Sequence, residues 1–157
     1  MANRESKAME DFTYNKYELT DETITVEGKT LYRIRALRDF GDVKAGDIGG
    51  YVESTNNLDN KQGKSWIYEN AMVYGNARVY AHAKVYGNAK IYGNARIWCV
   101  AKVYGNAKIY GNAIINGKAE IFENAEISDS AHIYGYAKIH GSATVSKSAC
   151  ITNGDIY

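Results

Sequence analysis

Proline is absent from the 157 residues, and the chain has only two cysteines, three methionines and three phenylalanines. Cys99 and Cys150 are too few and too far apart for a disulfide framework or a zinc site, so we expect reduced thiols. No long apolar run occurs, and the N-terminal stretch MANRESKAMEDF lacks the apolar core of a signal peptide. We therefore expect a cytoplasmic protein that has no contact with a membrane.

An excess of charge of one sign is also missing, since the formal net charge is +1. This near balance excludes a global field that would attract nucleic acid or a membrane surface. The charge is nevertheless unevenly placed along the chain. Residues 66–113 carry six bases against one acid, whereas residues 1–65 and 114–157 each carry a net charge of −2. The middle of the chain is a basic band between two mildly acidic ends.

Glycine and tyrosine are abundant, and both belong to a repeat of six residues that is clearest in VYGNAKIYGNAR, residues 85–96. Every sixth residue from Ala71 to Ala149 is alanine. A second register of six, with no insertion or deletion, is always isoleucine or valine: Ile67, Val73, Val79, Val85, Ile91, Ile97, Val103, Ile109, Ile115, Ile121, Ile127, Ile133, Ile139, Val145 and Ile151. Such self-similarity is the signature of a repeat architecture.

A period of six fits neither an α-helix nor a coiled coil, but it fits a short strand followed by a corner. The β-branched residue and the alanine would face inward, while Gly-Asn would supply the turn. Three units would close one triangular coil of roughly eighteen residues. The sequence therefore predicts an all-β fold in which residues 66–157 form a parallel β-helix of about five coils.

Residues 1–65 are not periodic, and we expect them to form a β-rich capping region. The stretch TITVEGKTLYRIRAL, residues 23–37, predicts a β-hairpin that turns at Glu27–Gly28. The economical role for this region is to cover the open edge of the first coil. Residues 1–12 are expected to be a disordered tail or a frayed helix.

The units AKVYGN and AKIYGN resemble the hexapeptide repeat of the left-handed β-helix proteins. Left-handed winding is implied by this resemblance alone, because the general preference of crossovers is right-handed. The leader LYRIRALRDFGDVKAGDIGGYVE, followed by NNL and WIYENA, is similar to that of small bacterial and phage-borne proteins with YGNA-type repeats. Those proteins often carry the label of transferase, which is inherited from the repeat.

The resemblance raises the hypothesis of a CoA-dependent acyltransferase with His82 as general base. Acyltransferases of this type usually have a loop that interrupts a coil and a C-terminal helix, and neither is visible in this sequence. The three histidines do not have the spacing of a γ-type carbonic anhydrase site, so we expect no metal site. No phosphate-binding loop, nucleophile elbow or paired-carboxylate signature occurs, and we expect no cofactor.

The outward positions offer another kind of site, because residues eighteen apart should stack in columns. Aromatic and basic columns interleave over the basic band and could bind an anionic partner. The alternative is that the tyrosines stabilise the coils and the bases keep the rod soluble. The predicted partner-binding set is Tyr68, Tyr74, Arg78, Lys84, Tyr86, Lys90, Tyr92, Arg96, Trp98, Lys102, Tyr104, Lys108 and Tyr110.

Our leading hypothesis is thus a non-catalytic protein that engages an acidic protein surface or a nucleic-acid complex. The phage-like resemblance implies an inhibitor of a host defence or nucleic-acid-handling complex. The alternatives are the acyltransferase and a purely structural, self-assembling module. Because the last coil would expose unpaired strand groups, either residues 153–157 fold over the end or two chains meet there, and we predict a dimer through the C-terminal coils.

Overall fold

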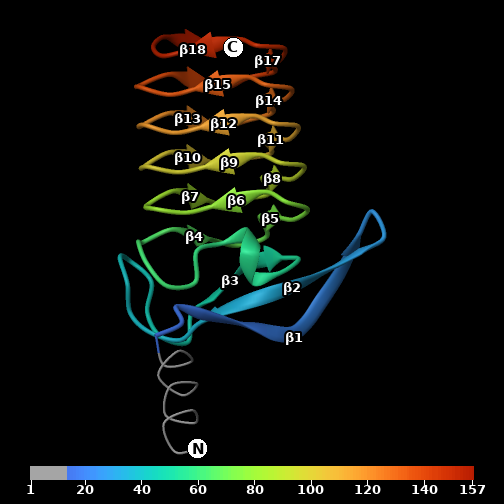
Figure 1. The fold of residues 1–157 in the computed structure, drawn as a ribbon, viewed down its shortest axis with the longest axis vertical. Helices are drawn as coiled ribbons and strands as arrows, with labels where there is room; N and C mark the ends of the chain where they lie inside the picture. Colours follow the sequence, from blue (N-terminus) through green and yellow to red (C-terminus); the bar gives the residue numbers. More distant parts are fainter. Residues whose placement is uncertain (1–13) are drawn as a thin grey trace, which may run out of the picture.

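The computed structural model describes residues 14–157, so the expectation for residues 1–12 lies outside it. Stacked coils of short strands form a rod, and a longer hairpin projects from its base (Figure 1). The described residues contain one short 3-10 helix and no α-helix, and no helix among them could cross a bilayer. The predicted all-β solenoid is confirmed.

The rod is built from strands of two residues that belong to three parallel sheets. One sheet contains β5 (Met72–Val73), β8 (Lys90–Ile91), β11 (Lys108–Ile109), β14 (Glu126–Ile127) and β17 (Thr144–Val145). The second consists of β6 (Arg78–Val79), β9 (Arg96–Ile97), β12 (Ile114–Ile115), β15 (His132–Ile133) and β18 (Cys150–Ile151). The third consists of β4 (Trp66–Ile67), β7 (Lys84–Val85), β10 (Lys102–Val103), β13 (Glu120–Ile121), β16 (Lys138–Ile139) and β19 (Asp155–Ile156). We call them the A, C and D faces in this order.

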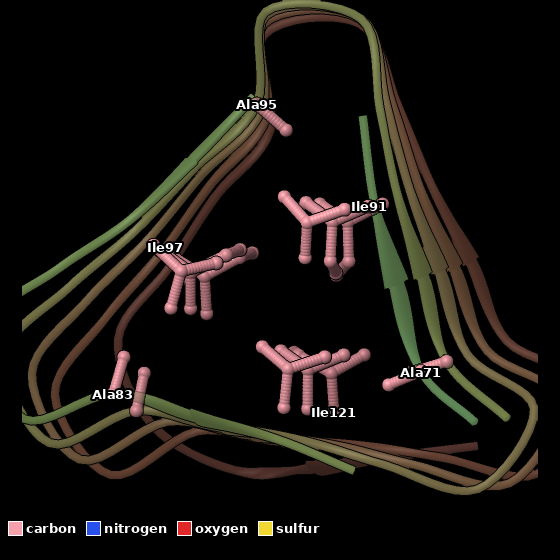
Figure 2. Close-up of a cluster of buried hydrophobic side chains, with 14 of the residues drawn as sticks. Ala71, Ala83, Ile91, Ala95, Ile97 and Ile121 are labelled. Carbon is pink, nitrogen blue, oxygen red and sulfur yellow. The ribbon is translucent and has the colours of Figure 1, made fainter. Parts of the chain in front are cut away.

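The inside of the triangle is the apolar core that the repeat predicts. Figure 2 shows Ile91, Ile97 and Ile121 pointing inward from the three walls, with alanines near the corners where space is narrow. Nearly all residues of the Ile/Val register and of the alanine register are buried. Burying each of these aliphatic side chains contributes roughly 1.5–3 kcal/mol before chain entropy is subtracted.

Consecutive coils are joined by a regular ladder of backbone hydrogen bonds. An amide of one coil donates to the carbonyl seventeen positions on, as in Lys84 N to Ala101 O at 3.0 Å and Tyr86 N to Val103 O at 2.9 Å. Corners adopt positive φ, for which glycine is the usual residue. The corner of Gly93 shows why, because a Cβ there would lie 2.9 Å from the backbone nitrogen of Gly111 in the next coil.

The rod is longer than predicted, since the sheet of the D face has six strands where about five coils were expected. The extra strand is β19, which pairs with β16 in the register Lys138 to Asp155. Residues 153–157 therefore continue the coil instead of folding over its end. The sequence repeat hides this strand because its spacing from β16 is seventeen residues, one fewer than between earlier coils.

The N-terminal region starts with the antiparallel hairpin of β1 (Tyr17–Val26) and β2 (Lys29–Ala36), which turns at Glu27–Gly28 as predicted. β2 pairs with β3 (Ile48–Val52), and β3 pairs in parallel with β5 of the rod. The 3-10 helix η1 (Thr55–Asn57) follows, and Leu58 then bridges to Val79. The region thus joins the A-face sheet and extends its ladder instead of merely lying on it.

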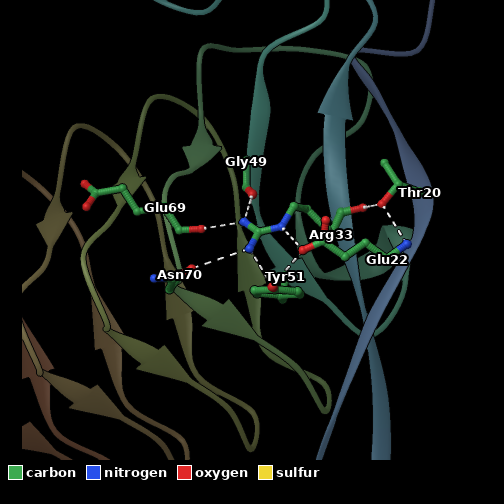
Figure 3. A network of polar contacts seen from close by, with 7 residues as sticks. All are labelled: Thr20, Glu22, Arg33, Gly49, Tyr51, Glu69 and Asn70. Carbon is green, nitrogen blue, oxygen red and sulfur yellow. Dashed lines mark hydrogen bonds and ion pairs between the residues drawn. The ribbon is translucent and has the colours of Figure 1, made fainter.

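Arg33 anchors the hairpin to the first coil, as Figure 3 shows. Its guanidinium pairs with Glu22 at 2.8 Å and donates to the carbonyl oxygens of Gly49 at 2.8 Å and Glu69 at 2.9 Å. It also lies 4.2 Å from the ring centre of Tyr51 and donates to its hydroxyl. Most of the guanidinium's donors are therefore used inside the protein.

Candidate interaction surface

The predicted aromatic columns exist as ladders along the corners of the rod. Between the D and A faces, Tyr86 and Tyr104 stack with centroids 4.6 Å apart, and Tyr104 and Phe122 follow at 5.0 Å. The neighbouring ladders are Tyr74–Tyr92–Tyr110, at 5.2 and 5.0 Å, and Tyr80–Trp98, at 5.7 Å. These pairs are nearly parallel, except that Tyr68 meets Tyr86 edge to face at 6.1 Å.

Stacking within a ladder uses the flat faces of the rings. Tyr86, Tyr92 and Tyr104 each have a ring neighbour on both sides, so their faces are covered and their edges point outward. A nucleic-acid base binds an aromatic residue through its flat face. The ladders therefore favour partners that contact ring edges and hydroxyl groups over partners that stack.

The predicted basic columns are also present, as cross-strand pairs on three faces. The register places Arg78 beside Arg96 on the C face. It pairs Lys90 with Lys108 on the A face and Lys84 with Lys102 on the D face. Like charges directly opposite each other destabilise a sheet. Three such pairs lie in one short segment of the rod, between residues 78 and 108.

The cap occupies part of the predicted surface. Asp42 accepts a hydrogen bond from the Tyr68 hydroxyl at 2.8 Å and pairs with the Lys84 ammonium at 3.3 Å. The hydrogen bond from Tyr68 is the main cause of the lowered pKa of the Asp42 carboxyl. Tyr74 is only 2% exposed, because it packs with Leu31 and Tyr51 under the hairpin. Tyr68, Lys84 and Tyr74 are therefore engaged inside the protein.

The remaining predicted bases are accessible. Within residues 14–157, no ion pair or hydrogen bond engages their charged groups. All of them are exposed except Lys90, which is half-buried. These free bases are Arg78, Lys90, Arg96, Lys102 and Lys108. Further along the rod the column of the D face alternates in sign, with Glu120 between Lys102 and Lys138. On the A face, Glu126 lies beside Lys108. The basic surface is thus confined to the first half of the rod.

The histidines do not converge on one site. His82 is exposed at a corner, where its Nδ1 accepts a hydrogen bond of 3.3 Å from the Lys64 amide. His132 packs against Tyr134 with ring centres 4.6 Å apart. His140 contacts Asp155 and Glu123. In the described part of the chain, no three His, Cys, Asp or Glu residues gather as they would around a metal ion.

Three residues of importance were not foreseen from the sequence. Phe122 stacks on His140 at 4.7 Å and His140 stacks on Tyr157 at 5.2 Å, so Tyr157 extends the first ladder. The shortened last spacing concealed this position in the sequence. Asp42 lies in a non-periodic segment, so nothing in the sequence links it to Tyr68. Lys16 is fully buried, and its ammonium donates to Gln62 O, Ser65 O and Ser65 Oγ at 3.1–3.2 Å. Burial lowers the pKa of Lys16 to about 8.

The arginines of the N-terminal region, Arg33, Arg35 and Arg38, all have partners inside the protein. Arg33 is held in the network described above. Arg35 pairs with Glu18, and Arg38 donates to the Lys61 carbonyl at 2.6 Å. These contacts hold the hairpin and the following loop in place.

The C-terminal end of the rod is open. Among residues 14–157, the strands β17, β18 and β19 are the last of their sheets and pair with a neighbouring strand on one side only. Ala143, Ala149, Ile151 and Ile156 are only partly buried there, although their equivalents in the preceding coils are fully buried. This end therefore has unpaired strand edges and a small, partly exposed apolar surface, the apolar floor.

These features define a β-solenoid with an integrated N-terminal cap, a basic first half and an open C-terminal end. No protein-family model matches the chain, and no curated protein matches it either.

Proposed function

We propose that this protein is a non-catalytic binding protein whose basic first half engages an acidic surface of a macromolecular partner. The observation that carries the proposal is the set of like-charged pairs in register, most clearly Lys90 beside Lys108. Such pairs lower the stability of the sheet, and a carboxylate-rich partner would relieve the repulsion. The exposed edges and hydroxyls of the tyrosine ladders would add hydrogen bonds beside the bases.

An acidic protein suits this surface better than a nucleic acid does. The ring faces are used within the ladders, so bases would find no stacking platform along Tyr86, Tyr92 and Tyr104. The phage-like resemblance of the sequence adds a biological setting: an inhibitor that covers an acidic site on a host defence or nucleic-acid-handling complex. That setting rests on the resemblance and is part of the proposal.

The proposal is tested with two labelled probes, poly-glutamate and single-stranded oligothymidylate. We expect poly-glutamate to bind more tightly, and its affinity to fall steeply with salt. In Lys90→Glu/Lys108→Glu, binding of poly-glutamate should be lost. The control Lys138→Glu reverses one lysine, which already pairs with Glu120 at 3.8 Å and lies outside the basic band. If the double variant and the control variant bound poly-glutamate equally well, the proposal would be contradicted.

The biological partner is then sought by capture from host lysate with the intact protein and with Lys90→Glu/Lys108→Glu side by side. An acidic protein that is retained by the first and lost by the second supports the proposal. A partner retained equally by both places binding elsewhere on the chain. Turnover of acetyl-CoA that is abolished by His82→Ala would instead support the acyltransferase.

We also propose that the protein is a dimer joined through its C-terminal coils. The open edges of β17, β18 and β19 and the partly buried Ile151 and Ile156 support this arrangement. Pairing the edges of two copies would satisfy their backbone groups and cover the apolar floor. Light scattering at micromolar concentration should give the mass of a dimer. In the variant Ile151→Lys/Ile156→Lys it should give that of a monomer, and a monomeric mass for the unaltered chain would refute the dimer.

A further inference from the structure

A groove lies where the A and C faces meet, between the base of the hairpin and the first coils. Its volume is about 910 Å³, and a second hollow of about 470 Å³ shares three of its residues, Asn56, Arg78 and Arg96. The first hollow has the size of a small-molecule pocket. Its lining is polar throughout: Lys29, Glu53, Ser54, Asn56, Gly75, Asn76, Arg78, Asn94, Arg96 and Asn112.

One wall of the groove is a ladder of asparagine side chains. Asn76 Nδ2 donates to Asn94 Oδ1 at 3.2 Å, and Asn94 Nδ2 donates to Asn112 Oδ1 at 3.1 Å. Each amide nitrogen has two hydrogens, so the first two asparagines keep one N–H available, and Asn112 keeps both among the described residues. The ladder therefore offers a row of amide donors, with the carbonyl oxygen of Asn76 as an acceptor at its end.

The adjoining wall holds Arg78 and Arg96, which are paired in register on neighbouring strands and whose guanidiniums have no ion-pair partner within residues 14–157. The two carboxylates of the hollows are already engaged. Glu53 pairs with Lys29 at 3.8 Å and accepts from the Gly75 amide at 2.8 Å. Asp59 accepts from the amides of Lys61 and Gln62 at 2.9 and 3.1 Å. Positive charge therefore dominates at the arginines.

We propose that this groove binds a small polyhydroxylated anion, a sugar-like molecule that carries a phosphate or a carboxylate. The planar guanidinium forks match either oxyanion in a bidentate manner. Amide groups, which both donate and accept, match hydroxyl groups. The first hollow has no large apolar side chain in its lining, and only the second is lined by Leu58, Val79 and Tyr80. The site is distinct from the lysine surface of the proposed function, although Arg78 and Arg96 were predicted as part of one partner-binding set.

The test is calorimetric titration of the intact protein with four probes: glucose 6-phosphate, glucuronate, glucose and inorganic phosphate. We expect the first, the second or both to bind more tightly than glucose and than inorganic phosphate. Binding of the phosphate ester alone or of the carboxylate alone identifies the oxyanion that the site selects. Equal affinity for glucose 6-phosphate and inorganic phosphate would overturn the proposal, because the asparagine wall would then contribute nothing. Absence of binding by both charged sugars would also overturn it.

Variants assign the binding to the two walls. Arg96→Met should weaken binding by about tenfold or more, since hydrogen bonds to charged groups are the stronger kind. The affinity of Arg96→Lys should lie between those of the unaltered protein and of Arg96→Met. Asn94→Leu should weaken it by about three- to tenfold without changing the charge. The matched controls are Lys102→Met on the D face and Asn106→Leu at another corner of the same coil, and both should bind normally. Equal losses in the controls would refute the site.

The two proposals fail separately. Lys90→Glu/Lys108→Glu should no longer bind poly-glutamate but should still bind the charged sugar. Asn94→Leu should bind poly-glutamate normally and the charged sugar more weakly.

Discussion

The hydroxyl of Tyr68 donates a hydrogen bond of 2.8 Å to Asp42, and this contact joins the first aromatic ladder to the cap. Lys84 reaches the other oxygen of the same carboxylate at 3.3 Å. A loop residue that has no place in the repeat thus holds two side chains of the rod. The contact also explains why the basic surface is smaller than the sequence suggests.

Asp42→Ala should lower the free energy of unfolding by about 1 kcal/mol, because the hydrogen bond and a half-exposed ion pair are lost together. The pKa of Asp42 is lowered in the fold, so its contribution is present above the unfolded pKa. It disappears as the pH falls through the folded value. Urea unfolding of Asp42→Ala, Tyr68→Phe and the double variant measures the coupling. Strictly additive losses would show that the two residues do not interact.

Ile97→Ala should cost about 2–5 kcal/mol, because the side chain is fully buried in the middle of the rod and would leave a cavity. In the monomer, Ile151→Ala should cost clearly less, since the last coil leaves this side chain partly exposed. In the proposed dimer, which covers this side chain, the two costs should become similar. Denaturant unfolding of both variants under the same conditions gives the comparison. Equal costs would indicate that the C-terminal end is covered, as it would be in the proposed dimer.

The pKa of Lys16 is about 8 in the folded protein and 10.5 as its ordinary value. Between these two pH values, Lys16 should make the fold more stable as the pH rises. Burial lowers the pKa of the folded ammonium, so the unfolded chain binds more protons within this window and the free energy of unfolding increases with pH. Lys16→Met should remove this increase. The comparison is the pH slope of the unfolding free energy for the two proteins, and an unchanged slope would contradict the assignment to Lys16.

Tyr74 should have the opposite effect at higher pH. Burial, with smaller contributions from Glu27 and Tyr92, raises the pKa of Tyr74 to about 12 from its ordinary 10. Its stabilising contribution is complete below about pH 10 and is lost as the pH rises through about 12, because the unfolded phenol ionises first. Tyr74→Phe should be as stable as the unaltered protein at neutral pH and lose less stability in this alkaline window. If the free energy of unfolding fell equally with pH in both proteins, Tyr74 would not be the cause of the alkaline loss of stability.

Much of the rod could be predicted because its structure is local and repeated. In residues 85–96, the pattern places valine, isoleucine and alanine in the core and Gly-Asn at the corners. Because the coils stack at a fixed interval, Tyr86 is then aligned with Tyr104, and Lys90 with Lys108. The N-terminal cap and the last strand of the rod could not be predicted in this way. β3 and Leu58 carry no repeat signal, and β19 follows after a shortened interval.

The sequence by itself determined the period, the inward and outward faces and the columns, since a strict repeat without insertions permits one register of stacking. The left-handed sense of winding, implied by the resemblance, stays a prediction. Only the tertiary structure decided which outward residues are free. Long-range packing of the non-periodic cap buries Tyr74 and pairs Lys84 with Asp42, and it leaves Arg78 and Arg96 open beside the asparagine ladder. Contacts between segments with unrelated patterns depend on the three-dimensional path of the chain, which no local period encodes.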